Sequence, residues 1–268
     1  MIALAVPAVQ PPPAAVQPSP AAVLFAPPAD RTLTLSVDSD HALDGQSQHR
    51  FISARALRFT RDGAGWIVDL VLTAAPHRSD ASGRMFETGI AALQGHMLRL
   101  RLDAGGAVRG IDDLATHWAR LCDAIAGLGS TARAGSDRAA AAAATAAALR
   151  RLPADRQAAM LGSLLRPALG VDLAALPVGT TAVTLPGAGP GLPALTGMRH
   201  VSNPAPGQVR VRIDAHGSAG DVAVVLSRET LVDAATGLLI AATERITTRM
   251  GAGPGVREQV TETTSRLR

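Results

Sequence analysis

The chain has 268 residues, with 26 basic residues, all of them Arg, against 22 acidic ones, so its formal net charge is only +4. This length suits one large domain or two small ones, and so small a net charge is not that of a strongly basic nucleic-acid binder. Apolar residues make up 47% of the chain and include 53 Ala, whereas aromatic residues make up 2%. The composition excludes collagen, coiled coils, disulfide scaffolds and charged disorder.

Residues 1–29 carry no charged side chain and are rich in Pro and Ala. The first residues resemble the end of a secretory signal, in which Val6 and Ala8 would be the small residues that signal peptidase reads. Residues 10–29 favour an extended, polyproline-like tether. We therefore predict a disordered leader over residues 1–29, the remnant of a signal peptide in a periplasmic or secreted protein. A Pro-rich leader of a cytoplasmic protein is the alternative.

Residues 30–110 show the two-residue period of β-strands. The two clearest strands place apolar residues on one face: Trp66, Val68, Leu70 and Leu72 in the first, and Leu98, Leu100 and Leu102 in the second. The residues from Asp62 to Gly65 supply a tight turn. A polar interval at 38–48 separates an early strand from one at 51–60, and the segment 85–93 is ambiguous. We predict an antiparallel meander over residues 30–110.

Residues 111–176 change to a helical period. The first helix has one apolar stripe, formed by Ile111, Leu114, Trp118, Leu121, Ile125 and Leu128. A second helix, from Ser136 to Arg151, is rich in Ala and could approach a neighbour closely while burying little area. Pro153 opens a third helix. These three helices form one insert.

Strand patterns return over residues 177–268, where Val209, Val211 and Ile213 alternate with charged residues. The stretch from Asp233 to Gly237 predicts a hairpin turn, because Asp can cap the turn and Gly can take a positive φ. The alternation of strand and helix that a parallel sheet needs is absent. We predict an α+β fold with a single domain over 30–268. It is a long curved antiparallel sheet, an open or half barrel, with a three-helix insert between two strand meanders. Two smaller sheets bridged by helices are the alternative.

The strand meander, the helical insert, the second meander, the turn at 233–237 and the leader together resemble the half-barrel periplasmic proteins typified by the lipoprotein carriers of the outer-membrane sorting pathway. The likeness is one of layout and covers residues 30–268, and uncharacterised secreted families share it. It implies a half barrel that holds an acyl chain or a similar apolar ligand.

The apolar strand faces are where such a ligand would bind. The candidate cavity-facing residues are Trp66, Val68, Leu70, Leu98, Leu100 and Leu102. Small residues in the covering helix could leave space next to them. Packing of an ordinary core would produce the same pattern, so both interpretations stay open.

Two groups of residues invite a chemical interpretation. Asp113 and His117 stand four apart on the first predicted helix, so they could form an acid/base or metal pair, although His117 lies where a boundary residue is usual. A polar cluster at 38–44 contains Asp38, Asp40, His41 and Asp44 but lacks the ligand order of a calcium loop, so we expect a solvated hairpin. We predict no catalytic residue, no metal site and no cofactor.

Three further features limit the partners. The single Cys122 is expected to pack on a helix. Arg99 with Arg101, and Arg210 with Arg212, lie on the outer faces of two strands. They would form a basic stripe for phosphates or anionic lipids if those strands were neighbours, and would otherwise face carboxylates. No run approaches the length of a membrane span, and without aromatic platforms we expect no nucleic-acid partner.

Three functional hypotheses follow. The first is a non-enzymatic exported protein that binds an apolar or lipid-like ligand in a half-barrel cavity. The second is an envelope structural or protein-interaction module with a filled core, whose contacts lie on the sheet edges or the Arg stripe. The third is an enzyme of unknown chemistry that uses Asp113 and His117.

Overall fold

The computed structural model describes residues 25–74, 84–130, 136–187, 192–251 and 255–268. The strands in these ranges are β1 (Thr32–Leu43), β2 (Gln46–Asp62), β3 (Gly65–Ala74), β4 (Met97–Leu102), β5 (Val108–Ile111), β6 (Gly179–Leu185), β7 (Leu195–Ser202), β8 (Gln208–Ala219), β9 (Val222–Asp233), β10 (Leu238–Met250) and β11 (Arg257–Leu267). The helices are α1 (Arg84–Ala91), α2 (Leu114–Ser130), α3 (Asp137–Arg150), α4 (Ala154–Gly162), the 3-10 helix η1 (Arg166–Ala168) and α5 (Val171–Ala174).

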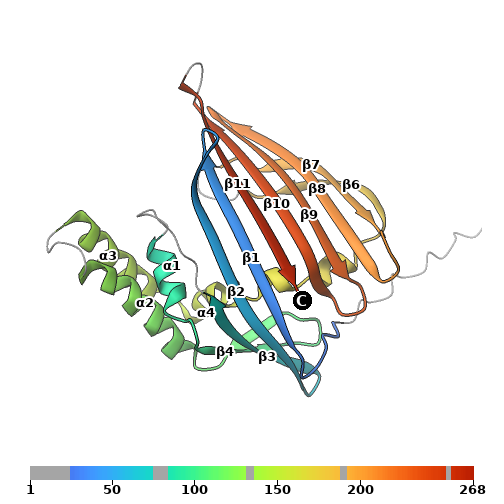
Figure 1. The fold of residues 1–268 in the computed structure, drawn as a ribbon, viewed down its shortest axis with the longest axis horizontal. Coiled ribbons are helices and arrows are strands. Elements are labelled where there is room, and N and C mark those ends of the chain that lie inside the picture. The colour runs from blue at the N-terminus through green and yellow to red at the C-terminus, as the bar shows by residue number, and fades with distance from the viewer. Residues whose placement is uncertain (1–24, 75–83, 131–135, 188–191, 252–254) are drawn as a thin grey trace, which may run out of the picture.

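All of these strands form one antiparallel sheet, which is open and curved (Figure 1). The strand order is β5-β4-β3-β2-β1-β11-β10-β9-β8-β7-β6, so each meander is complete before the two meet. They join where β1 pairs with β11, for example Val37 opposite Ser265. The predicted continuous antiparallel sheet is confirmed, and the alternative of two bridged sheets is wrong.

The predicted three-helix insert is wrong in its number of helices. Helix α1 lies between β3 and β4, inside the first meander, in the segment that the sequence leaves ambiguous. The insert contains α2, α3 and α4 close to their predicted places, followed by η1 and α5. Helix α1 has 8 residues and α5 has 4, and recognising a helical period takes a window of about 11–18 residues.

Two strand predictions also need correction. The polar interval at 38–48 does not interrupt the sheet, because β1 runs to Leu43 and β2 starts at Gln46, with Asp44 and Gly45 at positive φ in the turn. Strand β7 is absent from the predicted pattern, since only Leu195 and Val201 at its two ends are strongly buried. In both segments the backbone is hydrogen-bonded to neighbouring strands. Pairing of this kind depends on tertiary context, and the local alternation of apolar and polar residues does not reveal it.

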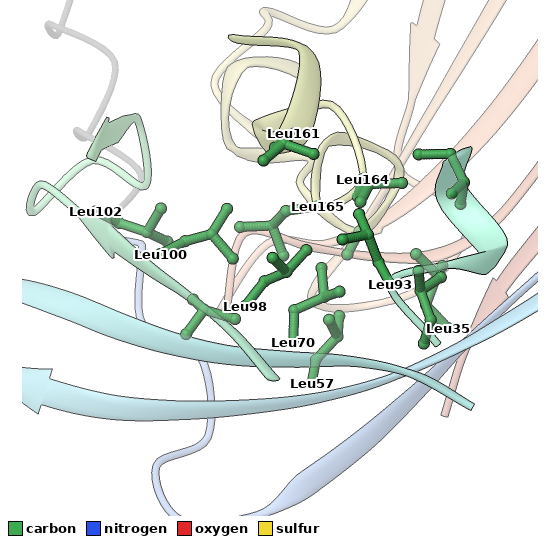
Figure 2. Packing of buried hydrophobic residues seen from close by; sticks show 14 of the residues in the cluster. Leu35, Leu57, Leu70, Leu93, Leu98, Leu100, Leu102, Leu161, Leu164 and Leu165 are labelled. Atoms are coloured by element: carbon green, nitrogen blue, oxygen red, sulfur yellow. The ribbon is translucent and has the colours of Figure 1, made fainter. Parts of the chain in front are cut away.

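The main hydrophobic cluster lies between the strands β1–β4 and the helices. Figure 2 shows leucines of the sheet pointing toward leucines around α4, with Leu93 beside them. The labelled residues are Leu35, Leu57, Leu70, Leu93, Leu98, Leu100, Leu102, Leu161, Leu164 and Leu165. We call this side of the sheet the inner face. In Figure 1, helices α1, α2 and α3 lie together at the left of the sheet.

Phe25 belongs to the same cluster. It is 2% exposed, and its ring meets those of Phe59 and Trp66 edge-on, with centroids 5.9 and 6.1 Å away. Residues 1–24 of the expected leader lie outside the described residues. The last part of that expected leader thus contributes a core side chain.

A second hydrophobic cluster covers the inner face of β7, β8 and β9. Its buried members are Leu195, Val201, Val209, Val211, Ile213, Ala215, Val224 and Leu226. The apolar residues that pack against it from outside the sheet come from the region of α5 (Leu173 and Leu176), from Leu192 and from Ala234. Within the described ranges, no residue of α1–α4 belongs to this cluster, so the helical layer serves one half of the sheet.

The predicted turn at 233–237 joins β9 to β10. The carboxylate of Asp233 accepts a hydrogen bond from the N–H of Ala235 at 2.8 Å, and the N–H of Gly237 donates to the Asp233 carbonyl oxygen at 2.8 Å. Gly237 has φ +71, and a Cβ there would lie 2.7 Å from Val171 Cγ2. A glycine is therefore required both by the backbone angle and by the closeness of α5.

Candidate functional site

A polar row crosses the inner face from β1 to β9. The strand register places Ser39 opposite Thr263, Thr263 opposite Glu244, and Glu244 opposite Arg228. We call these four residues, on β1, β11, β10 and β9, the polar belt. The row ends beside the second hydrophobic cluster, because Ile213 of β8 lies opposite Arg228.

Side chains of the belt bond to one another. The Oγ of Ser39 and the Oγ1 of Thr263 lie 2.8 Å apart. The Arg228 guanidinium donates to the Glu244 carboxylate, and this ion pair is only partly exposed. In the neighbouring row, the Oγ1 of Thr261 lies 3.0 Å from Nδ1 of His41. These contacts give the centre of the face paired hydroxyl and charged groups.

Arg55 lies on the inner face of β2, beside the main hydrophobic cluster. It is opposite Leu35 of β1 and Leu72 of β3, and it is 6% exposed. Its Nη1 donates to the carbonyl oxygen of Leu164 at 2.9 Å, while Nε has no hydrogen-bond partner among the described residues. Burial lowers the pKa of Arg55 to about 10, so the guanidinium keeps its charge at neutral pH. In the part of the chain that the structure describes, no carboxylate pairs with it.

Ser53 stands two residues before Arg55 on the same strand and the same face. It is 1% exposed and lies opposite Val37, and within the described part of the chain its Oγ has no hydrogen-bond partner. Phe51, the next residue on this face, is only partly buried. Two unsatisfied polar side chains therefore lie where the helix-covered core gives way to the polar belt.

Sequence reasoning missed Ser53 and Arg55, although a signal was present. Both fall in the alternating series that continues to Leu57 and Phe59, which are fully buried. A polar residue on the apolar face of a strand needs a partner or a function. That exception to the alternation would have identified the pair.

The six predicted ligand-binding residues all lie on the inner face in the main hydrophobic cluster. Trp66 is 4% and Leu102 is 5% exposed, and Val68, Leu70, Leu98 and Leu100 are at most 1% exposed. The register brings them together as cross-strand pairs, Trp66 with Leu102, Val68 with Leu100 and Leu70 with Leu98. Figure 2 shows Leu70, Leu98 and Leu100 on the side of the sheet that faces Leu161, Leu164 and Leu165. A ligand would therefore reach these residues only by displacing part of the helical layer.

The side chains of Asp113 and His117 do not interact as an acid/base pair would. No side-chain hydrogen bond links them, and Nδ1 of His117 has no hydrogen-bond partner in the ranges that the structure describes. Burial lowers the pKa of His117, and Arg120 adds to that effect, while Asp113 opposes it. His117 is 8% exposed, so it is a buried neutral histidine at the edge of α2.

The acidic cluster of the first hairpin divides between the two faces of the sheet. Asp38 pairs with Arg50, whose hydrogen bond lowers the pKa of Asp38, and Asp40 accepts from Ser47. His41 bonds to Thr261, two residues from the Ser39–Thr263 pair. Among the described residues, no group of three or more His, Cys, Asp or Glu is placed to hold a metal ion. A solvated hairpin accounts for the cluster.

The two Arg rows do not form a stripe. They lie on β4 and β8, which are far apart in the strand order. Each of the four Arg residues has a carboxylate partner: Arg99 with Asp69, Arg101 with Asp112, Arg210 with Glu229, and Arg212 with Asp214. Hydrogen bonds from Arg101 and Arg212 lower the pKa of Asp112 and Asp214. The outer face thus carries paired charges.

Comparison with known proteins adds no identity. No protein-family model matches the chain, and no curated protein matches its sequence.

Cys122 is buried, as predicted, and burial raises the pKa of its thiol. In the described ranges, no helix combines the length and apolar character that crossing a membrane requires.

Proposed function

We propose that this chain is a non-enzymatic binding protein that holds an apolar or lipid-like ligand against the inner face of its half barrel. The observation that carries the proposal is the continuity of the sheet, because pairing of β1 with β11 unites both meanders into one curved surface. That surface has large apolar areas, while its outer face is dominated by paired charges. Curved sheets with an apolar inner side are a common way to enclose such ligands.

The ligand would contact two areas. The first is the region of the six candidate residues, such as Leu70 and Leu98, beneath the helical layer. The second is the cluster on β7–β9, where Val183, Leu185 and Ile246 are only partly buried. The polar belt would contact polar groups of the ligand. An exported, periplasmic or secreted location agrees with the uncharged leader and with the resemblance to half-barrel carriers.

The experiment is binding of an apolar guest to the purified full chain. Native mass spectrometry and solvent extraction should reveal a co-purified lipid-like molecule, and a fluorescent fatty acid should bind saturably. A protein that carries no guest and ignores the fluorescent fatty acid overturns the proposal. Leu98→Ala tests where the guest binds. It shortens a side chain of the inner face, so the binding constant should change only if the guest contacts this part of the face.

A second candidate function, association through a sheet edge, is favoured by β6. Among the described strands, β6 ends the sheet and pairs only with β7. It carries no charged residue over Gly179–Leu185. Thr180, Thr181 and Ala182 are exposed, and natural sheet edges usually carry charges or Pro that block pairing. The occupant that fits is a second copy of this chain, because two uncharged edges meet without repulsion.

Light scattering after size-exclusion chromatography tests this second candidate. A dimer that becomes monomeric in Ala182→Lys, and persists in the control Ala182→Ser, supports pairing through β6. A wild-type protein that stays monomeric at high concentration excludes it.

A further inference from the structure

The buried guanidinium of Arg55 lacks a counter-charge in the described part of the chain. Removing a charged group from water costs several kcal/mol unless an opposite charge or several hydrogen bonds compensate. Arg55 has one hydrogen bond, from Nη1 to Leu164, and no ion pair among the described residues. An anion is the partner that would satisfy it.

The free side of this guanidinium has the geometry of an anion receptor. Nη1 is bonded to Leu164, and Nε is buried without a hydrogen-bond partner among the described residues. Nε and Nη2 form one edge of the guanidinium, and this is the edge that a ligand would contact. Two parallel N–H donors along one edge match the two oxygens of a carboxylate or a phosphate.

Ser53 adds a third donor on the same face. Alternate residues of a strand lie about 7 Å apart, so an anion between Ser53 and Arg55 can reach both side chains. The Oγ of Ser53 is as poorly satisfied as Nε of Arg55 and is more deeply buried.

The surroundings indicate an amphiphile. Leu35 and Leu72 flank Arg55 on the neighbouring strands, and Val37 flanks Ser53. A small hydrated anion would gain nothing from these apolar neighbours, whereas an acyl chain would bury area against them. The head group and the first carbons of an acyl chain therefore fit the same place.

We infer that Arg55 and Ser53 form an anion-binding subsite on the inner face that holds the carboxylate or phosphate head group of an amphiphilic ligand. This inference rests on the proposed function and specifies the class of ligand. Ser53 and Arg55 would bind the polar head group, and the apolar areas of the inner face would contact the acyl chain.

Calorimetric titration with defined probes tests the subsite. The probes are dodecanoate, dodecyl phosphate and dodecanol below their micelle concentrations, together with acetate and inorganic phosphate. The wild-type protein should bind either anionic amphiphile about tenfold or more tightly than dodecanol, the factor expected from a charge-assisted hydrogen-bonded contact. Acetate and inorganic phosphate should bind far more weakly than the amphiphiles.

Variants of β2 supply the controls. Arg55→Met should remove the preference for the anionic probes while leaving dodecanol binding within about threefold, and Ser53→Ala should reduce the preference by about threefold. Arg58→Met is the matched control, because Arg58 is an exposed residue of the same strand whose partner is Asp30. It should leave all binding constants unchanged. Arg55→Gln keeps a donor for Leu164 and replaces the Met variant if that one fails to fold.

The outcomes separate the two claims. Equal binding of dodecanoate and dodecanol, or a preference that survives Arg55→Met and Arg55→Gln, overturns the subsite and leaves the proposed function intact. Binding of inorganic phosphate or acetate that depends on Arg55, without any amphiphile binding, overturns the proposed function and the amphiphile assignment. Absence of all binding overturns both.

Discussion

Arg55 of β2 donates a hydrogen bond from Nη1 to the main-chain carbonyl oxygen of Leu164, 2.9 Å away. This bond joins the sheet to the segment between α4 and η1, two parts of the chain that are 109 residues apart. It is the most deeply buried side-chain contact of a charged residue in the described ranges, and it leaves most of the guanidinium donors unused.

We expect Arg55→Met to keep or raise the free energy of unfolding, by up to about 2 kcal/mol. The substitution loses a hydrogen bond to a charged group, about 1.5–3 kcal/mol, but it removes the larger desolvation cost of an unpaired buried charge. Urea denaturation of both proteins without ligand measures the difference. A loss of more than about 2 kcal/mol would show that the bond to Leu164 stabilises the fold more than burial of the charge destabilises it.

Leu98→Ala should lower the free energy of unfolding by about 2–5 kcal/mol, because it opens a cavity where sheet and helices meet. Leu98 is 1% exposed and lies opposite Leu70. Its neighbour Met97 points to the outer face and is 49% exposed, so Met97→Ala is the control and should change stability by less than about 0.5 kcal/mol. Equal effects of the two substitutions in urea denaturation would contradict the assigned faces of β4.

His117 should make the fold sensitive to mild acid. Burial holds the pKa of His117 below its ordinary value of 6.5. Between the folded and the unfolded pKa, the unfolded chain binds more protons, so stability is complete above about pH 6.5 and falls as the pH decreases through that window. His117→Gln should reduce the loss of stability between pH 7.5 and pH 5 in urea denaturation at constant ionic strength. An unchanged pH dependence would show that His117 protonates equally in both states.

The turn between β9 and β10 predicts an order of effects. Gly237→Ala should cost about 1–3 kcal/mol, because alanine is strained at a positive φ and its Cβ would press on Val171. Asp233→Ala should cost less, about 0.5–1.5 kcal/mol, since it removes mainly the hydrogen bond to the Ala235 N–H. Thermal unfolding of the two variants should rank them in this order. The reverse order would mean that α5 yields readily to the added methyl group.

Local patterns predicted the parts of the fold in which one face of an element is uniformly apolar. The strand from Trp66 to Leu72 and the helix around Trp118, Leu121 and Ile125 have their buried residues as predicted. Such elements are recognisable because each side chain on the buried face independently favours leaving water. Short helices such as α1, and strands such as β7 whose faces mix apolar and polar residues, have too few buried side chains on one face to be recognised in this way.

The candidate site depended on partners that are distant in sequence. The contacts of these polar residues form only because β1 pairs with β11 and because β2 packs against the segment that contains Leu164. Ser39 meets Thr263 across 224 residues of chain, and Arg55 meets Leu164 across 109. Alternation shows which face of a strand a residue occupies, but not what stands opposite.

The amino-acid sequence by itself determined the antiparallel strands, their division into two meanders, the principal helices and the turn at 233–237, because these follow from periods of two or 3.6 residues and from the backbone freedom of glycine. Tertiary structure decided between the predicted single sheet and two bridged sheets. It alone showed that helices cover only half of the inner face, and that Arg55 is buried without a counter-charge among the described residues. Those properties arise from non-local pairing and desolvation, whose energies depend on the residues that meet in space and not on those that are adjacent along the chain.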